Sequence, residues 1–402
     1  MESIKNIYRI GNGPSSSHTI GPKRAATQFL QKNPDADSFR VTLYGSLAAT
    51  GKGHFTDKVI NDTLSPRGEV TIIWEPKIVL PFHTNGMKFE SFVDDHKSDE
   101  WFIYSVGGGS LANETTQPEK KIYDHVSMSE ITEWCERYGK SYWEYVFEHE
   151  DEDLSDYLAL VWKTMREAID RGLEQEGVLP GGLGLRRKAL EFNTKARSYN
   201  ESLRNRGLIY SYALAASEEN ATCGVVVTAP TCGSCGVLSG VLYHLSKSKN
   251  FPDSRIIRAL ATAGLFGNIV KRNASISGAT VGCQGEVGVA CAMAAAASCQ
   301  LFGGTTAQIE YAAEMGLEHH LGMTCDPVCG LVQVPCIERN AYAAARALDV
   351  NLYSMFTDGK HIVSFDHVVE VMMQTGTDIP SVYKETSEGG LAKMYNSKDN
   401  PK

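Results

Sequence analysis

The sequence has no apolar run of the roughly 18 residues that a membrane-spanning helix needs. The longest candidate, 287–297, is short and directly follows Glu286. The N-terminus also lacks the apolar core and small-residue cleavage site of a secretory signal peptide. These absences argue against a membrane or exported protein, and we expect a soluble protein of the cytoplasm.

The sequence also lacks a cluster of basic residues. Its 39 lysines and arginines are scattered, and the formal net charge at pH 7 is −9. Nucleic acids and anionic membrane surfaces are bound by concentrated positive charge. We therefore expect neither a nucleic-acid partner nor a membrane partner.

Cysteine is too scarce for a disulfide scaffold. The 402 residues include 10 cysteines, whereas disulfide scaffolds exceed about 8–10% cysteine. Nine of the ten lie between residues 223 and 336. Without an export signal, such clustering indicates metal or redox chemistry. Small buried apolar side chains are the favoured interpretation for Cys135, Cys223, Cys291 and Cys299.

Secondary-structure signals change along the chain. β-Branched and aromatic residues predict strands at 40–44, 69–74, 87–93 and 101–106, and residues 128–176 look helical. Beyond about residue 185, Ala- and Leu-rich segments predict helices near 186–204, 207–219, 236–247, 254–270, 286–301, 306–318, 330–348 and 365–375. We therefore expect an α+β domain at 1–150, a helical connector at 151–184 and an all-helical domain at 185–402.

Three cysteines lie beside glycine or proline at the expected starts of helices. They are Cys283 in GCQGEVG, Cys325 in GMTCDPVCG and Cys336 in VPCIERN. A helix start presents free N–H groups and partial positive charge, which favour the thiolate that a metal needs. An anionic iron–sulfur cluster suits the same position.

Spacing alone leaves the kind of site open. The separations of 42 and 11 residues do not resemble the close spacing of ferredoxin ligands. An iron–sulfur cluster and purely structural thiols both fit. So does a zinc site of four cysteines, made by Cys232, Cys235, Cys325 and Cys329.

A series of motifs then favours one of these kinds of site. NASISGA, GCQGEVGV, TCDPV and GLVQVPCIERNA occupy 273–279, 282–289, 324–328 and 330–341. LPGGL, EENA and TAPT occupy 179–183, 218–221 and 228–231, and SSSHT and GSLAATGKGHFTD occupy 15–19 and 45–57. In this order they resemble the iron–sulfur-dependent L-serine dehydratases, or L-serine ammonia-lyases, in the single-chain form with fused β- and α-type domains.

The resemblance implies a lyase that converts L-serine to pyruvate and ammonia. It also implies a [4Fe-4S] cluster in the helical domain, held by Cys283, Cys325 and Cys336. Three cysteine ligands leave one iron open to act as a Lewis acid on the substrate hydroxyl. No pyridoxal phosphate is needed in that chemistry. For the assembly we expect a homodimer.

The sequence departs from the family pattern in two ways. Some single-chain members end in a cysteine that caps the fourth iron, and this sequence ends without one. The family usually reads TAPTNGAAG where this chain has TAPTCGSCG at 228–236, so Cys232 and Cys235 are additions, and Cys329 replaces a usual glycine. These three thiols either pack in the core or approach the cluster.

His54 is the candidate base. It lies in GHFTD, with Asp57 three residues later. If this segment is helical, Asp57 shares a face with His54 and orients the imidazole, so we assign both a catalytic role. A structural histidine is the alternative.

Polar residues elsewhere are candidates for binding the substrate. A cluster of hydrogen-bond donors comprises Ser15, Ser16, Ser17, His18 and Thr19. Such residues cap helices, and a cap loop also binds carboxylates. Lys271 and Asn273 precede the cluster loop and are further candidates for the carboxylate. Glu286 or Glu338 could act in acid–base steps if burial raises its pKa.

Two rival functions remain at this point. A cysteine desulfidase shares the α-type domain, but SSSHT and GHFTD belong to the β-type domain of the serine enzymes. A zinc or redox-sensing protein would use the four cysteines named above for zinc.

Overall fold

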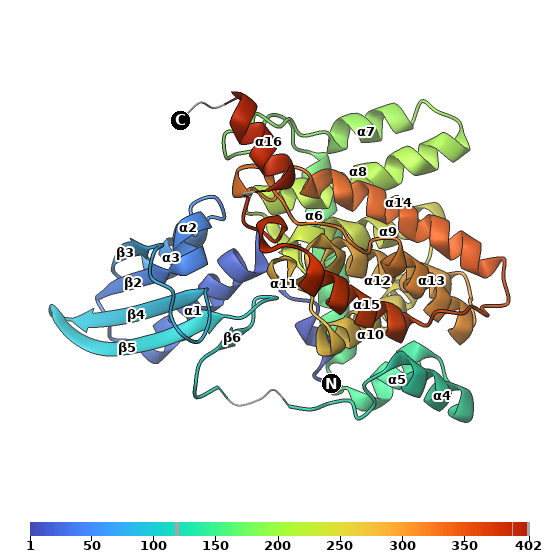
Figure 1. Ribbon diagram of the computed structural model, residues 1–402, viewed down its shortest axis with the longest axis horizontal. Helices are drawn as coiled ribbons and strands as arrows, with labels where there is room; N and C mark the ends of the chain where they lie inside the picture. The colour runs from blue at the N-terminus through green and yellow to red at the C-terminus, as the bar shows by residue number, and fades with distance from the viewer. Residues whose placement is uncertain (117–119, 388, 400–402) are drawn as a thin grey trace. The chain divides into compact units, whose positions relative to one another are not determined.

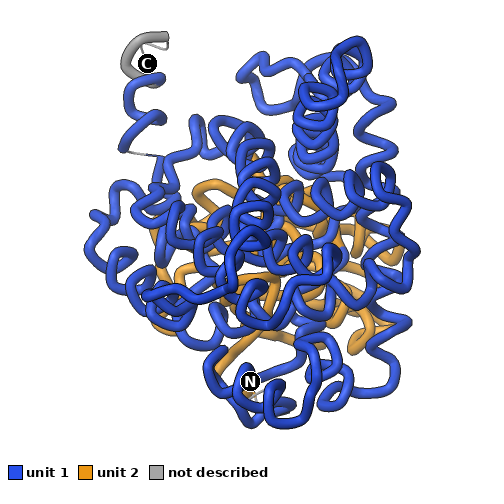
Figure 2. The backbone as a smooth tube through the Cα atoms, turned by 90° about the vertical axis from the view of Figure 1, so that its right-hand side faces the viewer, with its two compact units in different colours: residues 1–10, 119–402 blue, residues 11–118 orange. Residues whose placement is uncertain are grey.

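The computed structural model describes residues 1–116, 120–387 and 389–399 (Figure 1). The chain forms two compact units (Figure 2). Gly11–Pro118 makes the small unit, and Met1–Ile10 together with Glu119–Lys402 makes the large unit. The first residues join the large unit through bonds such as that from Asn268 Nδ2 to the Glu2 carbonyl, at 2.7 Å.

The small unit is built on a five-stranded sheet in the order β3-β2-β4-β5-β6. Only the pairing of β2 with β3 is parallel. Parallel neighbours require a crossover, and helices α2 and α3 provide it. The strands are β2 (Ser38–Tyr44), β3 (Glu69–Glu75), β4 (Gly86–Val93), β5 (His96–Ser105) and β6 (Leu111–Ala112), and the helices are α1 (Gly21–Lys32), α2 (Gly45–Thr50) and α3 (Thr56–Leu64). All four predicted strands are confirmed.

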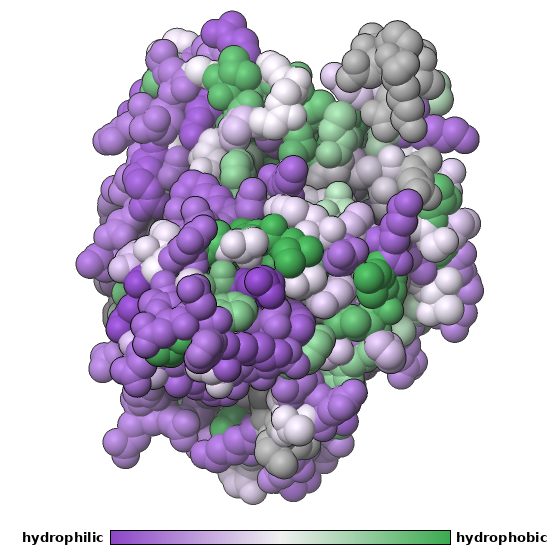
Figure 3. Space-filling model, turned by 90° about the vertical axis from the view of Figure 1, so that its left-hand side faces the viewer, coloured by the Kyte–Doolittle hydropathy of each residue, from purple (hydrophilic) through white to green (hydrophobic). Residues whose placement is uncertain are grey.

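The two faces of this sheet differ in polarity. On β4, Met87 and Phe89 are fully buried in the core of the small unit. The alternate residues Lys88 and Glu90 form an ion pair, with Lys88 Nζ 3.1 Å from the Glu90 carboxylate. This alternation is typical of an antiparallel sheet with one face on the core. Figure 3 shows one side of the molecule, where small groups of apolar residues lie among hydrophilic ones.

The large unit is mainly helical, as predicted. Its longer helices are α4 (Met128–Tyr138), α5 (Tyr142–His149), α6 (Leu154–Leu173), α7 (Ala189–Ala196), α8 (Glu201–Ala221), α9 (Cys235–Ser248), α10 (Asp253–Asn273), α12 (Val287–Leu301), α13 (Thr306–Glu318), α14 (Cys336–Met355), α15 (Phe365–Asp378) and α16 (Gly390–Asp399). Shorter elements include α11 (Gly278–Val281), β1 (Ile10–Asn12) and β7 (Val225–Val227). In the described part of the chain, no helix combines the length and hydropathy needed to cross a membrane.

Two helices differ from their predicted ranges. The helix expected at 330–348 begins at Cys336, because Pro335 disfavours helical geometry in the residue before it. The segment expected to be helical at 186–204 is interrupted after α7. There Asn200 starts a new helix, and its side-chain oxygen accepts from the Leu203 N–H at 3.1 Å.

Helix α12 lies at the centre of the large unit. It is apolar on all sides and almost wholly buried, as expected for a helix surrounded by protein. It packs against α9, α10, α13 and α14 (Figure 1). Its small side chains permit close approach. For example, a Cβ on Gly316 of α13 would lie 2.9 Å from the Ala292 Cα.

The compact units have different boundaries from the predicted segments. Helices α4 and α5 were expected in the first domain, at 1–150. They instead contact α13 and α10 of the large unit. The contacts therefore divide the chain near residues 10 and 118 rather than near 150 and 184.

The close packing of α6 on α8 can be tested by substitution of Gly172. A Cβ at this position would lie 2.3 Å from the Ala215 carbonyl oxygen and 2.9 Å from its Cα. Because backbone atoms cannot step aside cheaply, we expect Gly172→Ala to lower stability by about 1–3 kcal/mol in denaturant unfolding. Glu167→Ala, at an exposed position of the same helix, should change it by less than about 0.5 kcal/mol. Equal stability of the two variants would contradict this packing.

Candidate functional site

Three separate segments of the large unit bring the predicted cysteine ligands together. Cys283 begins the short helix η4 (Cys283–Gly285), and Cys336 begins α14. Both therefore lie at helix starts, as predicted. Cys325 lies instead in an extended segment, where its N–H donates to the Tyr383 carbonyl at 2.8 Å and its carbonyl accepts from the Glu385 N–H at 2.7 Å. The cysteines are 4%, 5% and 8% exposed in chain order.

The three thiols influence one another's ionisation. A hydrogen bond from Cys325 is the main cause that lowers the pKa of Cys283, and it raises the pKa of Cys325 well above its ordinary value. Burial, followed by the charge of Cys283, raises the pKa of Cys336 well above its ordinary value. Ionisation is therefore easier at Cys283 than at Cys325 or Cys336.

Arg339 supplies positive charge beside these thiols. It lies one turn after Cys336 on α14, and its guanidinium donates to Cys283. Nη1 also donates to the Thr324 carbonyl at 2.7 Å. The positions of Cys283, Cys325 and Arg339 are therefore coupled through one side chain.

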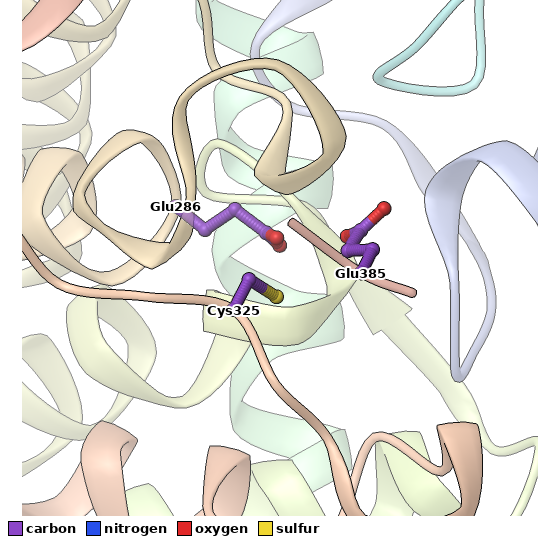
Figure 4. Close-up of side chains that lie close together, drawn as sticks. All are labelled: Glu286, Cys325 and Glu385. Atoms are coloured by element: carbon purple, nitrogen blue, oxygen red, sulfur yellow. The ribbon is translucent and has the colours of Figure 1, made fainter. Parts of the chain in front are cut away.

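Two carboxyl groups lie next to Cys325. The ligand atoms of Glu286, Cys325 and Glu385 all lie within 4.8 Å of one another (Figure 4). Residue Glu385 is exposed as a whole, but its carboxyl group donates a hydrogen bond to Glu286. Burial of the carboxyl and the charge of Glu286 raise the pKa of Glu385 well above its ordinary value. Burial also raises the pKa of Glu286, so the surroundings favour the protonated form of both carboxyl groups.

The TAPT and ERNA motifs hold this site together. Thr231 Oγ1 donates to Glu286 Oε2 at 2.6 Å. Asn340 Nδ2 donates to the Gly233 carbonyl at 2.7 Å and to the Cys336 carbonyl at 2.9 Å. Asn340 Oδ1 accepts from the Gly236 N–H at 2.9 Å. Asn340 therefore fastens the start of α14 to the loop before α9.

The donor set fits a metal cluster better than a four-cysteine zinc site. Three buried thiols and a guanidinium suit an anionic group with thiolate ligands. Such thiols bind different iron atoms, so they need not be in mutual contact. Of the cysteines of the zinc alternative, Cys329 is exposed whereas Cys232 and Cys235 are buried. Among the described residues searched, the one group of ligand atoms within 4.8 Å of one another contains Cys325 but none of Cys232, Cys235 and Cys329, nor Cys283 and Cys336.

The remaining thiols have ordinary environments. Cys135, Cys291 and Cys299 are buried in the core of the large unit, which confirms their interpretation as apolar packing residues. Burial raises the pKa of Cys135 and Cys291 to about 12. Cys223 is only partly buried and has a positive φ of 63°.

Three predicted polar residues have other partners. Lys271 forms an ion pair with Glu2. Asn273 Nδ2 donates to the Val126 carbonyl at 2.7 Å. Glu338 is exposed and pairs with Lys188 Nζ at 3.0 Å, so of the two glutamates considered for acid–base steps, only Glu286 lies beside the cysteines.

The SSSHT and GHFTD motifs meet within the small unit. The rings of His18 and His54 are 4.8 Å apart between centroids. Thr19 Oγ1 donates to the His54 carbonyl at 2.8 Å, and Thr56 Oγ1 donates to the His18 carbonyl at 2.5 Å. The Oγ of Ser46, a residue of the GSLAATG stretch, lies 3.1 Å from His18 Nε2. Polar residues from the two N-terminal motifs, SSSHT and GSLAATGKGHFTD, thus form one cluster.

The serines of SSSHT have the capping role considered from the sequence. Ser15 Oγ accepts from the His18 N–H at 3.2 Å, at the start of η2 (Ser16–Ile20). The Ser16 carbonyl accepts from the N–H of Gly21, the first residue of α1. Ser17 Oγ lies 2.9 Å from His18 Nδ1. This loop is therefore well ordered by its own hydrogen bonds.

Asp57 does not orient His54 as expected. Residues 51–55 form a turn, and α3 begins at Thr56, so the two side chains do not share a helix. In the described chain, His54 Nδ1 donates to the Thr50 carbonyl at 3.0 Å, and no hydrogen bond joins it to Asp57. Nε2 is then the nitrogen that can accept a proton. Burial lowers the pKa of His54 to about 4, so the ring is neutral at pH 7.

Sequence reasoning missed two residues of the cysteine site. Arg339 was part of a recognised motif, and its position one helical turn after Cys336 was the available signal. Glu385 had no such signal, because it reaches the site through the backbone pairing of 383–385 with Cys325.

Comparisons with known proteins agree with these motifs. The family model described as serine dehydratase alpha chain matches residues 95–392, and that described as serine dehydratase beta chain matches residues 3–67. An L-serine dehydratase of Streptomyces coelicolor is 39% identical, with 97% of this chain and 98% of the relative covered. L-serine dehydratase TdcG of Escherichia coli is 39% identical over 98% of this chain and 99% of its own.

A more distant relative gives the same result. The L-serine dehydratase of Helicobacter pylori is 36% identical, with 97% of this chain and 98% of the relative covered. The family models and the full-length relatives together show that the chain belongs to the serine dehydratase family, with the beta- and alpha-type regions fused in one polypeptide.

Proposed function

We propose that this chain is an L-serine ammonia-lyase that converts L-serine to pyruvate and ammonia with a [4Fe-4S] cluster bound by Cys283, Cys325 and Cys336. The observation that carries the proposal is the meeting of three buried thiols with Arg339, in a chain of the serine dehydratase family. When bound, the cluster would supply a Lewis-acidic iron for the substrate hydroxyl.

The surrounding residues stabilise negative charge and hold protons. Arg339 offsets the charge of the thiolates, and Arg–thiolate contact in a buried site is worth more than in water. In the Glu286–Glu385 pair, burial raises the pKa of both carboxyl groups, which favours their protonated forms. A protonated carboxyl group of this pair can donate its proton to the departing hydroxyl group, which leaves as water while the carboxyl group becomes a carboxylate.

Proton removal from Cα requires a base, and we assign this role to His54. The Thr50 carbonyl fixes its Nδ1–H and so takes the orienting role expected of Asp57. Ser15, Ser16, Ser17, His18 and Thr19 remain our candidates for binding the substrate carboxylate. Elimination of water then leaves an enamine, which becomes an imine and hydrolyses to pyruvate and ammonia.

The rival functions receive less support. A cysteine desulfidase does not account for the match to the serine dehydratase beta chain. Of the cysteines in the four-cysteine zinc alternative, Cys329 is exposed whereas Cys232 and Cys235 are buried, which makes a common site less favourable. A homodimer and a cytoplasmic location remain predictions from the sequence.

The cluster ligands can be tested by iron content. After anaerobic reconstitution, we expect about four irons per chain in the wild type and less than about one in Cys283→Ala, Cys325→Ala or Cys336→Ala, because the remaining two thiolates hold a cubane poorly. Pyruvate formation should be lost in parallel. Cys291→Ala, a buried thiol of α12, is the control and should keep its iron. A ligand variant with full iron content would remove that cysteine from the set.

Arg339 can be tested in the same preparations. Removal of its charge leaves buried thiolates without compensation. We expect Arg339→Gln to retain less than about half of the wild-type iron after gel filtration, and Arg339→Lys to retain an intermediate amount. Arg346→Gln changes the charge at an exposed position of the same helix and should retain all of it. Wild-type iron retention in Arg339→Gln would refute a role in holding the cluster.

The role of His54 can be tested by kinetics. We expect His54→Ala to lower kcat by roughly 10²–10⁴-fold with an unchanged cluster spectrum. His96→Ala, at an exposed position of β5, should leave kcat unchanged. If His54 only binds the carboxylate, KM will rise instead while kcat stays near the wild-type value.

The pH profile gives a second test of the same role. Burial lowers the pKa of His54 to about 4, and only the neutral imidazole accepts a proton. The His54-dependent limb of kcat/KM should therefore fall as the pH drops through about 4, and this group should cause no change between pH 6 and 8. A limb from this residue near pH 6.5 would show that His54 is not buried as described.

A further inference from the structure

The large unit contains a polar pocket that includes none of the cysteine-site residues. Its volume is about 610 Å³, and it is lined by residues of α7, α8 and α9, the end of α6 and the adjoining loops. This volume lies within the range of about 300–1,000 Å³ that is common for small-molecule sites. No residue assigned to the proposed reaction lines it.

The rim of this pocket is strongly basic. Its charged residues are Arg197, Arg204, Lys247 and Lys249, against the single carboxylate of Glu201. Within the part of the chain that is described, none of the four cations forms a salt bridge. This local excess of positive charge contrasts with a formal net charge of −9 for the whole chain.

The floor of the pocket offers buried hydrogen-bonding groups. Asn193, Tyr212 and His244 line it and are 9%, 5% and 5% exposed. Asn193 Oδ1 accepts from Arg197 Nε at 3.0 Å. The Asn193 side chain also forms a hydrogen bond with Tyr212. These hydrogen bonds hold buried polar groups beside the pocket, where they can also contact a polar ligand.

Helix electrostatics explain only part of the charge. Lys247 and Lys249 lie at the C-terminal end of α9, and Arg197 follows α7, where cations are favourable. Arg204 lies in the first turns of α8, which begins at Glu201. A cation is unfavourable there, because the N-terminal end of a helix already carries partial positive charge. A negatively charged ligand would offset this cost.

We propose that this pocket binds a small organic anion with at least two negative charges, either a phosphate ester or a polycarboxylate. The guanidinium groups of Arg197 and Arg204 match the paired oxygen atoms of both groups. The buried amide of Asn193 contributes a neutral donor. L-Serine is a poor candidate, because its zwitterion carries no net charge. The site is therefore separate from the proposed reaction and does not depend on it.

Isothermal titration calorimetry tests this site in the full chain, prepared anaerobically with its cluster and at about 50 mM salt. Inorganic phosphate and citrate are the two probes, and acetate is the monovalent control. We expect phosphate or citrate to bind at least tenfold more tightly than acetate. Binding of phosphate alone would indicate a phosphate ester, and binding of citrate alone a polycarboxylate. Affinity should fall as salt is raised. Failure of both probes to bind would overturn the proposal.

Variants of the pocket residues test whether the anion binds in this pocket. We expect Arg197→Gln combined with Arg204→Gln to weaken binding at least tenfold. Lys195→Gln removes one positive charge from α7, outside the pocket lining, and should leave the affinity within about twofold. Lys247→Gln provides an independent test if the double variant does not fold, and it should weaken binding at least threefold. Equal weakening by Lys195→Gln, or wild-type affinity in the pocket variants, would place the anion elsewhere.

Discussion

Burial of negative charge is the constraint on which the cysteine site depends. Three thiols and the carboxyl group of Glu286 lie in the interior of a helical unit, where an ionised group is costly unless it is paired. Arg339 compensates part of this charge, and Thr231 donates to Glu286. A bound cationic metal would supply the rest. This chemistry explains why the site needs ligands from several segments rather than from one loop.

Those segments are held in position by close helix packing. The central helix α12 consists largely of small side chains, so α9, α10, α13 and α14 approach it closely. Its N-terminal end follows Cys283 and Glu286 directly. Asn340 then fixes the start of α14 to the loop before α9. A rigid core therefore sets the positions of the cysteines, and residues 383–385 close the site by pairing with Cys325.

Much of this arrangement was predictable, for identifiable reasons. Strands such as β2 and β4 have the composition of half-buried strands, and the helices from α9 to α15 are Ala- and Leu-containing segments between glycine and proline breaks. Cys283, Cys325 and Cys336 were found through their motifs. The orientation of His54 was not, because a turn at 51–55 replaces the expected helix. Partners of Lys271 and Asn273 were also hidden, since Glu2 and Val126 are remote in sequence.

The sequence by itself determined the family, the helical character of the second half and the identity of the candidate cysteine ligands. These features depend on local composition and on motifs, which can be recognised in the linear sequence. Only the tertiary structure decided that Glu385 lies beside Glu286, that the first ten residues join the large unit, and that basic residues of α7, α8 and α9 surround one pocket. Each of these is a contact between distant segments, and such contacts follow from how the helices pack rather than from the order of the residues.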